Sequence, residues 1–241
     1  MKNINWSELG FGYFKTDYNV RCEYKDGKWG ELYATEDVNM NIHMASTCLH
    51  YGQEVFEGLK AFRGADGKVR LFRVEENAKR MINSGEYLKM AVPSVELFTK
   101  ACIEAVKLNA DYIPPYGSGA SLYLRPMLIG VGPQVGVKPS ADYLFAVFVT
   151  PVGPYYKDGF NCIKVIIDYD HDRAAPKGTG HVKVGGNYAA SLDSGEIAHQ
   201  KGFASVIFLD PATKQYIDEC SAANFFGIRD GKYITPDSHS V

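Results

Sequence analysis

One lysine stands in a glycine-rich stretch where an amine could do chemistry. The run from Gly178 to Tyr188 reads Gly-Thr-Gly-His-Val-Lys-Val-Gly-Gly-Asn-Tyr, with Lys183 at its centre. Glycines let a backbone turn sharply and approach a ligand closely. A lysine held there and shielded from water could present its amine for Schiff-base chemistry. The alternative, a solvated lysine on a flexible loop, is far commoner for any lysine taken alone.

Three other side chains complement that lysine. Tyr188 follows it by five residues, Glu219 lies farther along the chain, and Arg80 falls in a helix-like segment. Taken singly, each is more often an exposed or half-buried residue without a catalytic role. Together they meet the needs of pyridoxal 5′-phosphate. That cofactor takes a lysine for its Schiff base, a carboxylate for its ring nitrogen, a phenol for its 3-oxygen and an arginine fork for its phosphate.

Composition limits the other possibilities. The chain has 241 residues and a net charge of -2, which gives no reason to expect nucleic acid or an anionic membrane as partner. Its five cysteines are widely spaced and odd in number, which favours reduced thiols in a cytoplasmic protein. Neither a signal peptide nor an apolar run long enough to cross a membrane is visible.

Hydrophobic periodicity and turn residues predict a mixed α+β class in two segments. Short antiparallel strands are expected in residues 11–35, and Asp-Gly turns at 26–27, 66–67 and 230–231 predict hairpins. Helices are expected over 74–90, from an N-cap at Ser94 to Leu108, and over 188–199. Longer strands are expected from Ser121, over 141–149, over 162–168 and over 204–209.

The proline-rich run Pro151-Val-Gly-Pro154 predicts a linker between two domains. We therefore expect a small N-terminal α+β domain over 1–150, a linker over 151–160 and the first part of a larger domain over 161–241. Asp170-His171-Asp172 predicts a polar turn rather than a metal site, and no metal is expected.

The sequence resembles the branched-chain amino-acid aminotransferases, which are fold-type IV pyridoxal-phosphate enzymes. The matching stretches are spread in order along the chain. They are Tyr51-Gly-Gln-Glu-Val-Phe-Glu-Gly-Leu-Lys-Ala-Phe62, Arg70-Leu-Phe-Arg73, Leu122-Tyr-Leu-Arg-Pro126, Gly136-Val137, Pro151-Val-Gly153, Gly178-Thr-Gly180, Lys183-Val-Gly-Gly-Asn-Tyr188 and Glu219-Cys-Ser-Ala-Ala-Asn-Phe-Phe226.

The resemblance implies a role for each matching residue. Lys183 would form the Schiff base and move the proton, Tyr188 would bind the 3-oxygen, Glu219 would pair with the pyridinium nitrogen, and Arg80 would hold the phosphate. The substrate pocket would be walled by Tyr51, Phe56, Tyr123 and Tyr155, with Phe11 a weaker candidate. Arg125 and Asn224 would support the site from behind, and Val135 and Val137 would lie on a loop that reaches a neighbouring subunit.

The resemblance also implies an activity: transamination of leucine, isoleucine and valine with 2-oxoglutarate, by ping-pong kinetics, in a homodimer or larger homo-oligomer. The family pattern leads us to expect a large domain that continues beyond Val241. Two alternatives stay open. One is another fold-type IV enzyme, such as a D-amino-acid aminotransferase or an aminodeoxychorismate lyase. The other is a chain that folds without binding cofactor.

Overall fold

The computed structural model describes residues 2–154, 161–238 and 240–241. The chain divides into two compact units, Met1–Phe160 and Asn161–Val241.

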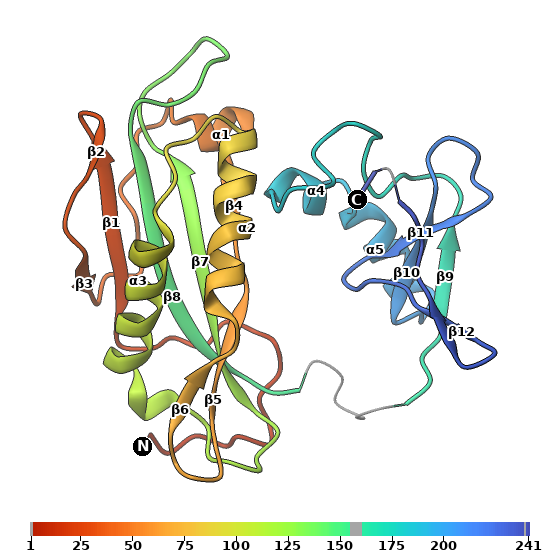
Figure 1. The fold of residues 1–241 in the computed structure, drawn as a ribbon, viewed down its shortest axis with the longest axis horizontal. Coiled ribbons are helices and arrows are strands. Elements are labelled where there is room, and N and C mark those ends of the chain that lie inside the picture. The colour runs from red at the N-terminus through yellow and green to blue at the C-terminus, as the bar shows by residue number, and fades with distance from the viewer. Residues whose placement is uncertain (1, 155–160, 239) are drawn as a thin grey trace. The chain divides into compact units, whose positions relative to one another are not determined.

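The first unit is built on an antiparallel sheet (Figure 1). The main strand order is β2 (Lys28–Trp29), β1 (Asn19–Lys25), β8 (Tyr143–Val152), β7 (Ser121–Gly130), β5 (Leu59–Arg63) and β6 (Val69–Leu71). In addition, β3 (Tyr33–Thr35) pairs with β1, and β4 (Glu54–Phe56) pairs with β7. The ladder between β7 and β8 joins Ser121 with Val152 at one end and Gly130 with Tyr143 at the other.

Two helices cover one face of this sheet (Figure 1). They are α2 (Val74–Tyr87) and α3 (Val95–Leu108), while the short α1 (Thr47–Tyr51) precedes β4. The α3 helix begins where predicted, because the Ser94 hydroxyl accepts a hydrogen bond from the Leu97 amide at 3.2 Å. Its buried Phe98 stacks on Phe145 of β8 with ring centroids 5.8 Å apart, so this face of the sheet carries the core.

Asp-Gly pairs make tight turns that the sequence predicted. Asp26 and Gly27 both have positive φ angles, of 50° and 77°, and join β1 to β2. Asp230 and Gly231 do the same, at 51° and 70°, between β12 (Gly227–Arg229) and β13 (Lys232–Ile234). Two consecutive residues with positive φ angles form a type I′ turn, and the twist of this turn matches that of the paired strands.

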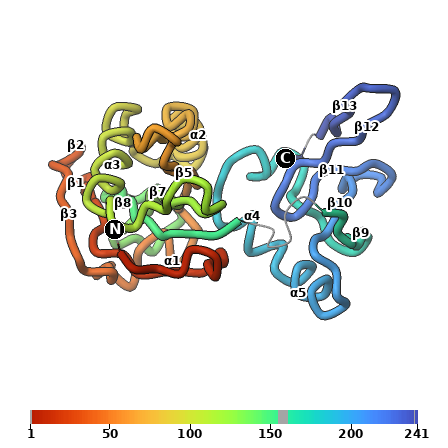
Figure 2. Tube along the Cα trace, turned by 90° about the horizontal axis from the view of Figure 1, so that it is seen from below, coloured from red at the N-terminus to blue at the C-terminus, as the bar shows by residue number. Residues whose placement is uncertain are grey.

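The second unit has its own small sheet, in the order β11 (Ile217–Cys220), β10 (Ser205–Leu209) and β9 (Val165–Asp168). The β9 and β10 strands are parallel, and their connection contains α4 (Gly185–Ala189) and α5 (Leu192–Gln200). The two helices follow one another along the tube in Figure 2. Ala198 of α5 packs with Val206 and Phe208 of β10 in a buried cluster.

Several boundaries differ from the sequence prediction: α2 ends at Tyr87 rather than at residue 90, and β9 begins at Val165 rather than at residue 162. The helix expected over 188–199 is broken into α4 and α5, and at the break the Tyr188 carbonyl accepts hydrogen bonds from both the Ser191 amide, at 3.1 Å, and the Ser191 hydroxyl, at 2.9 Å. The strand expected to end at Val149 continues to Val152, with Pro151 opposite Leu122. In the described part of the chain, no helix is both long and apolar enough to cross a membrane.

Replacing Phe145 by alanine should destabilise the first unit by about 3–5 kcal/mol, because a fully buried ring that packs on α3 would leave a cavity. Phe62→Ala is the matched control, since Phe62 on β5 is 45% exposed, and it should cost less than about 1 kcal/mol. Urea unfolding followed by tryptophan fluorescence measures both. Equal losses for the two variants would contradict this account of the core.

Candidate functional site

Lys183 and Tyr188 face each other across the start of α4. Lys183 lies just before the helix, and Tyr188 is in its single turn. The Lys183 Nζ donates a hydrogen bond to the Tyr188 Oη at 2.5 Å and lies 4.9 Å from the centroid of the same ring. Both side chains are half-buried. The five-residue spacing seen in the sequence therefore brings an amine and a phenol into direct contact.

The glycine-rich stretch is pinned by Asn187. This side chain is 6% exposed and donates to the carbonyls of Thr179 at 2.7 Å and Val182 at 2.9 Å. The Thr179 hydroxyl in turn donates to the Asn187 Oδ1 at 2.7 Å. A Cβ on Gly180 would overlap the backbone of Ser240. The segment before Lys183 is thus held from several sides, unlike the solvated flexible loop of the alternative interpretation.

Arg173 joins the other polar groups of the second unit. Its side chain is 8% exposed, and its Nε lies 3.0 Å from the Glu219 Oε1. Its Nη1 donates to the Asn187 carbonyl at 3.0 Å, and its guanidinium carbon lies 5.5 Å from the centroid of the Tyr188 ring. One arginine therefore contacts a carboxylate, a backbone carbonyl and a phenol ring.

Glu219 lies on β11, opposite Phe208 of β10, and its side chain is 21% exposed. Burial raises the pKa of its carboxyl above the ordinary value, while the positive charges of Arg173 and Lys183 act in the opposite direction. Lys183, Tyr188 and Glu219 thus belong to one electrostatic neighbourhood, with Arg173 at its buried end.

In the first unit, a guanidinium lies between two of the predicted substrate-pocket rings. The Arg125 guanidinium carbon lies 4.7 Å from the centroid of Phe56 and 5.3 Å from that of Tyr123. Its Nε and Nη2 also donate to the Tyr123 hydroxyl at 3.2 and 3.1 Å. Phe11 packs edge-on against Tyr123 with centroids 5.1 Å apart.

These residues share one face of the sheet. Arg125 is paired with Phe148 of β8, whereas Phe145 of the same strand packs on α3. Because side chains alternate between the faces of a strand, Arg125 and Phe148 point away from the helices. A methyl group on Gly58 would collide with the Tyr123 hydroxyl, so the glycine is what lets that ring lie over the strand.

Arg80 is held by a carboxylate on the helix-covered side. Its Nε and Nη2 each donate to one oxygen of Glu57 at 2.7 Å. Glu57 is fully buried, while the side chain of Arg80 is 54% exposed. Asn77, one turn earlier on α2, donates to the Glu57 Oε2 at 2.8 Å.

The remaining predicted site residues are not in the clusters around Lys183, Arg125 or Arg80. The Tyr51 hydroxyl donates to the Val135 carbonyl, and Val135 and Val137 are 83% and 86% exposed. Asn224 is exposed in the segment after β11. Tyr155 lies outside the described residues. Tyr51 therefore contacts the loop of Val135, while Phe56 and Tyr123 contact Arg125.

The Asp170-His171-Asp172 run forms a polar turn, as predicted. The Asp168 Oδ1 accepts hydrogen bonds from the amides of Asp170 and His171, at 2.8 and 3.0 Å. The His171 ring lies 3.0 Å from Asp168 and 3.3 Å from Asp193. Among the described residues, no three His, Cys, Asp or Glu side chains are grouped as a metal ion would require.

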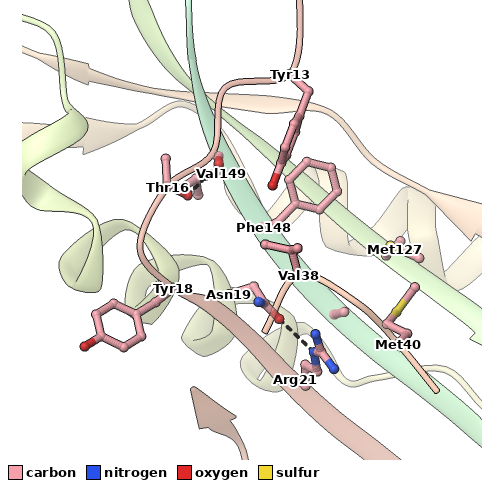
Figure 3. Close-up of a pocket in the computed structure, with 11 residues that line it drawn as sticks. Tyr13, Thr16, Tyr18, Asn19, Arg21, Val38, Met40, Met127, Phe148 and Val149 are labelled. Atoms are coloured by element: carbon pink, nitrogen blue, oxygen red, sulfur yellow. Dashed lines mark hydrogen bonds between the residues drawn. The ribbon is translucent and has the colours of Figure 1, made fainter. Parts of the chain in front are cut away.

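A separate cavity of about 260 Å³ lies on the sheet face away from α2 and α3 (Figure 3). Its wall includes Tyr13, Met40, Met127 and Phe148, and Arg21 bonds to Asn19 at its edge. Within the described part of the chain, none of the predicted cofactor or substrate residues lines this cavity. It is therefore not the site that the sequence predicted.

Sequence reasoning missed Arg173, Asn187 and Glu57. Arg173 stands in an Asp-Arg-Ala-Ala-Pro run, where an arginine is usually solvated. Asn187 and Glu57 lay inside the motifs that were identified, but their types gave no reason to single them out. The sequence feature that could have identified them is a charged or amide residue flanked by small and apolar residues.

Comparison with known proteins assigns the chain to a family. The model of the class IV aminotransferases matches residues 54–241. A branched-chain-amino-acid aminotransferase of Haemophilus influenzae is 53% identical over the whole chain, which covers 72% of that relative. The Escherichia coli branched-chain amino acid aminotransferase superposes with a TM-score of 0.72 at 27% identity, over 92% of this chain and 68% of that one.

A third relative is another branched-chain amino acid aminotransferase of known structure, complexed with N-(5′-phosphopyridoxyl)-L-glutamate. It has a TM-score of 0.71 at 27% identity, over 95% of this chain and 69% of that one.

The chain belongs to the class IV aminotransferases and, within them, to the branched-chain-amino-acid aminotransferases. The predicted α+β fold of type IV and the predicted enzyme class are confirmed. Pyridoxal 5′-phosphate is the cofactor of this family, so that prediction is confirmed as well.

Replacing Arg173 by methionine should raise the pKa of Glu219 further, because it removes a cation 3.0 Å from the carboxylate. A carboxyl whose pKa is raised by folding stabilises the protein at low pH, and that stability is lost as pH rises through the raised pKa. Arg173→Met should therefore cost more stability at about pH 7 than at about pH 5, measured by urea unfolding. The double variant Arg173→Met/Glu219→Gln should show no such difference, and a pH-independent cost in the single variant would contradict the coupling.

Proposed function

We propose that this chain transfers amino groups between leucine, isoleucine or valine and 2-oxoglutarate. The contact between the Lys183 amine and the Tyr188 phenol carries the proposal, because these are the two groups that the chemistry needs side by side. The relative complexed with N-(5′-phosphopyridoxyl)-L-glutamate supports the choice of co-substrate, since its ligand joins a phosphopyridoxyl group to glutamate.

The described residues fit the cofactor. An amine, a phenol and a half-buried carboxylate lie in one electrostatic neighbourhood of the second unit, and glycines stand on both sides of the lysine in the sequence. Lys183 would hold the cofactor covalently, Tyr188 would bind its 3-oxygen, Glu219 would pair with its ring nitrogen and Arg80 would bind its phosphate. When bound, the cofactor supplies an electron sink for the α-carbon of the substrate.

Each protein group then has a defined task. The Lys183 Nζ, when it is not bonded to the cofactor, would accept the α-proton of the amino acid and later return it, acting first as a base and then as an acid. Tyr188 accepts a hydrogen bond from that nitrogen and so orients it. Glu219 must be ionised to keep the ring nitrogen protonated, and the cations of Arg173 and Lys183 oppose the effect of burial on its pKa.

The substrate side chain would lie against the aromatic rings of the first unit, Phe56 and Tyr123. Burying a branched aliphatic chain against such rings contributes about 1.5–3 kcal/mol. Two half-reactions that share one set of residues give ping-pong kinetics. We also propose that the two units are the small and the cofactor-binding domains, that Tyr51 and Tyr155 complete the pocket, that Asn224 supports it, and that the protein works as a homodimer.

Lys183→Ala should abolish the visible absorption band that appears when pyridoxal 5′-phosphate is added, and should lower transamination of leucine by about 10³-fold or more. Borohydride reduction followed by peptide mass spectrometry should place the cofactor on Lys183 in the parent. Lys201→Ala is the matched control, because Lys201 is exposed at the end of α5, and it should behave as the parent. A covalent cofactor on any other lysine would overturn the assignment.

A panel of amino-group donors distinguishes the alternatives within the family. Leucine, isoleucine and valine should react faster than alanine and faster than any D-amino acid. Higher turnover of D-alanine than of L-leucine would favour a D-amino-acid aminotransferase instead.

Gly58→Ala should raise the KM for leucine by about tenfold while leaving the cofactor band intact, because the added methyl group displaces Tyr123 and breaks its bonds to Arg125. Gly195→Ala is the control, since nothing lies within 4 Å of its added methyl group. An unchanged KM in Gly58→Ala would remove Tyr123 from the substrate pocket.

A further inference from the structure

The carboxylate beneath Arg80 is the most deeply buried charged group among the described residues of the first unit. Glu57 has no exposed surface, and both of its oxygens accept hydrogen bonds from Arg80, at 2.7 Å each. Asn77 adds a third donor at 2.8 Å. A buried carboxylate is costly unless such partners surround it.

Core stability alone does not explain this pair. The buried residues of α2 include Ala78 and Met81, each next in sequence to a residue that bonds to Glu57, so apolar side chains are accommodated on this helix. Replacing buried ion pairs by well-packed apolar residues is often neutral or stabilising. The pair therefore points to a demand that apolar packing does not meet.

The backbone beneath Glu57 is fixed as well. Glu57 stands between β4 and β5, which both pair with β7, and its amide donates to the Pro126 carbonyl at 2.8 Å. The carboxylate is thus anchored to the central strands of the sheet. The guanidinium that it grips sits on a side chain that is 54% exposed, so a rigid base carries a cation that solvent can reach.

We infer that Glu57 is a positioning residue, which sets the guanidinium of Arg80 in one orientation to receive the phosphate of pyridoxal 5′-phosphate. The inference rests on the proposed role of Arg80. The fork engages both Nε and Nη2, so it fixes the plane of the guanidinium as well as its place. An arginine side chain has many rotamers, and a cation fixed before binding loses less freedom when the phosphate arrives.

The Glu57 carboxylate affects phosphate binding in two ways of opposite sign. If only net charge mattered, removing the negative charge of Glu57 would strengthen phosphate binding. If positioning matters, the same change weakens it. Glu57→Gln keeps the shape of the side chain and removes the charge, so it separates the two.

The test compares pyridoxal 5′-phosphate with pyridoxal, which lacks the phosphate, in absorption titrations of the protein. Glu57→Gln should weaken pyridoxal 5′-phosphate about tenfold, because a charge-assisted fork becomes a neutral contact, and should change pyridoxal less than about twofold. Arg80→Lys should show the same selective loss. The double variant should be no weaker than Arg80→Lys alone, since the fork is already lost.

Glu76→Gln is the matched control. Glu76 lies one turn before Arg80 on α2 and pairs with Lys79 at 2.8 Å, but it is exposed. It should bind both compounds as the parent does. If Glu57→Gln fails to fold, Asn77→Ala carries the test: loss of its bond to Glu57 should weaken pyridoxal 5′-phosphate about threefold and leave pyridoxal unchanged.

Arg80→Lys tests the phosphate site, and Glu57→Gln tests the positioning role separately. Equal losses of affinity for the two compounds in Arg80→Lys would show that Arg80 does not bind the phosphate. The proposed role of Arg80 and the positioning role of Glu57 would then both be wrong. A selective loss in Arg80→Lys would uphold the phosphate site. The positioning role would then be overturned by any of three results for Glu57→Gln, or for Asn77→Ala in its place. These are normal binding of both compounds, equally weakened binding of both, and tighter binding of pyridoxal 5′-phosphate.

Discussion

Two carboxylates that are largely withdrawn from water are each held by one arginine in the described part of this protein. Glu57 is fully buried under Arg80, and Glu219 is 21% exposed beside Arg173. Burial disfavours the charged form of a carboxyl, so both arrangements would be unstable without the paired cation. The arginines differ in one respect: Arg173 is itself buried, while Arg80 is half-exposed. One therefore acts inside the protein, and the other presents its charge outward.

The backbone that supports each pair is fixed in a similar way. Glu57 sits at the junction of β4 and β5, where its amide is bonded to the central strand β7. Glu219 sits on the edge strand β11 of a smaller sheet, opposite Phe208, whose ring is fully buried. In both cases the backbone is fixed by pairing with a neighbouring strand, and an arginine, joined by Asn77 in the case of Glu57, holds the charged side chain. Groups held in this way need little reorganisation when a charged ligand binds.

Sequence reasoning found the residues whose chemistry is unusual for their type and missed those that act through packing. Lys183 and Tyr188 were predicted because an amine and a phenol in a glycine-rich run suggest a specific cofactor, and they are in contact. The Asp-Gly turns at 26–27 and 230–231 were predicted because two consecutive positive φ angles have few sequence solutions, whereas at 66–67 only Gly67 has a positive φ. Arg173 was missed because its role depends on Asn187 and Glu219, which are far from it in the sequence but adjacent in space.

The broken helix after Lys183 shows how a local choice serves the site. The helix predicted over 188–199 is interrupted, since α4 ends after one turn, where the Ser191 amide and hydroxyl both bond to the Tyr188 carbonyl. That single turn carries both Asn187, which points back to the glycine stretch, and Tyr188, which reaches Lys183. A short helix leaves α5 to pack on β10 through Ala198 in its own direction. Because the helix is broken, α4 can be oriented for the contacts of the site, while α5 is oriented independently for packing in the core.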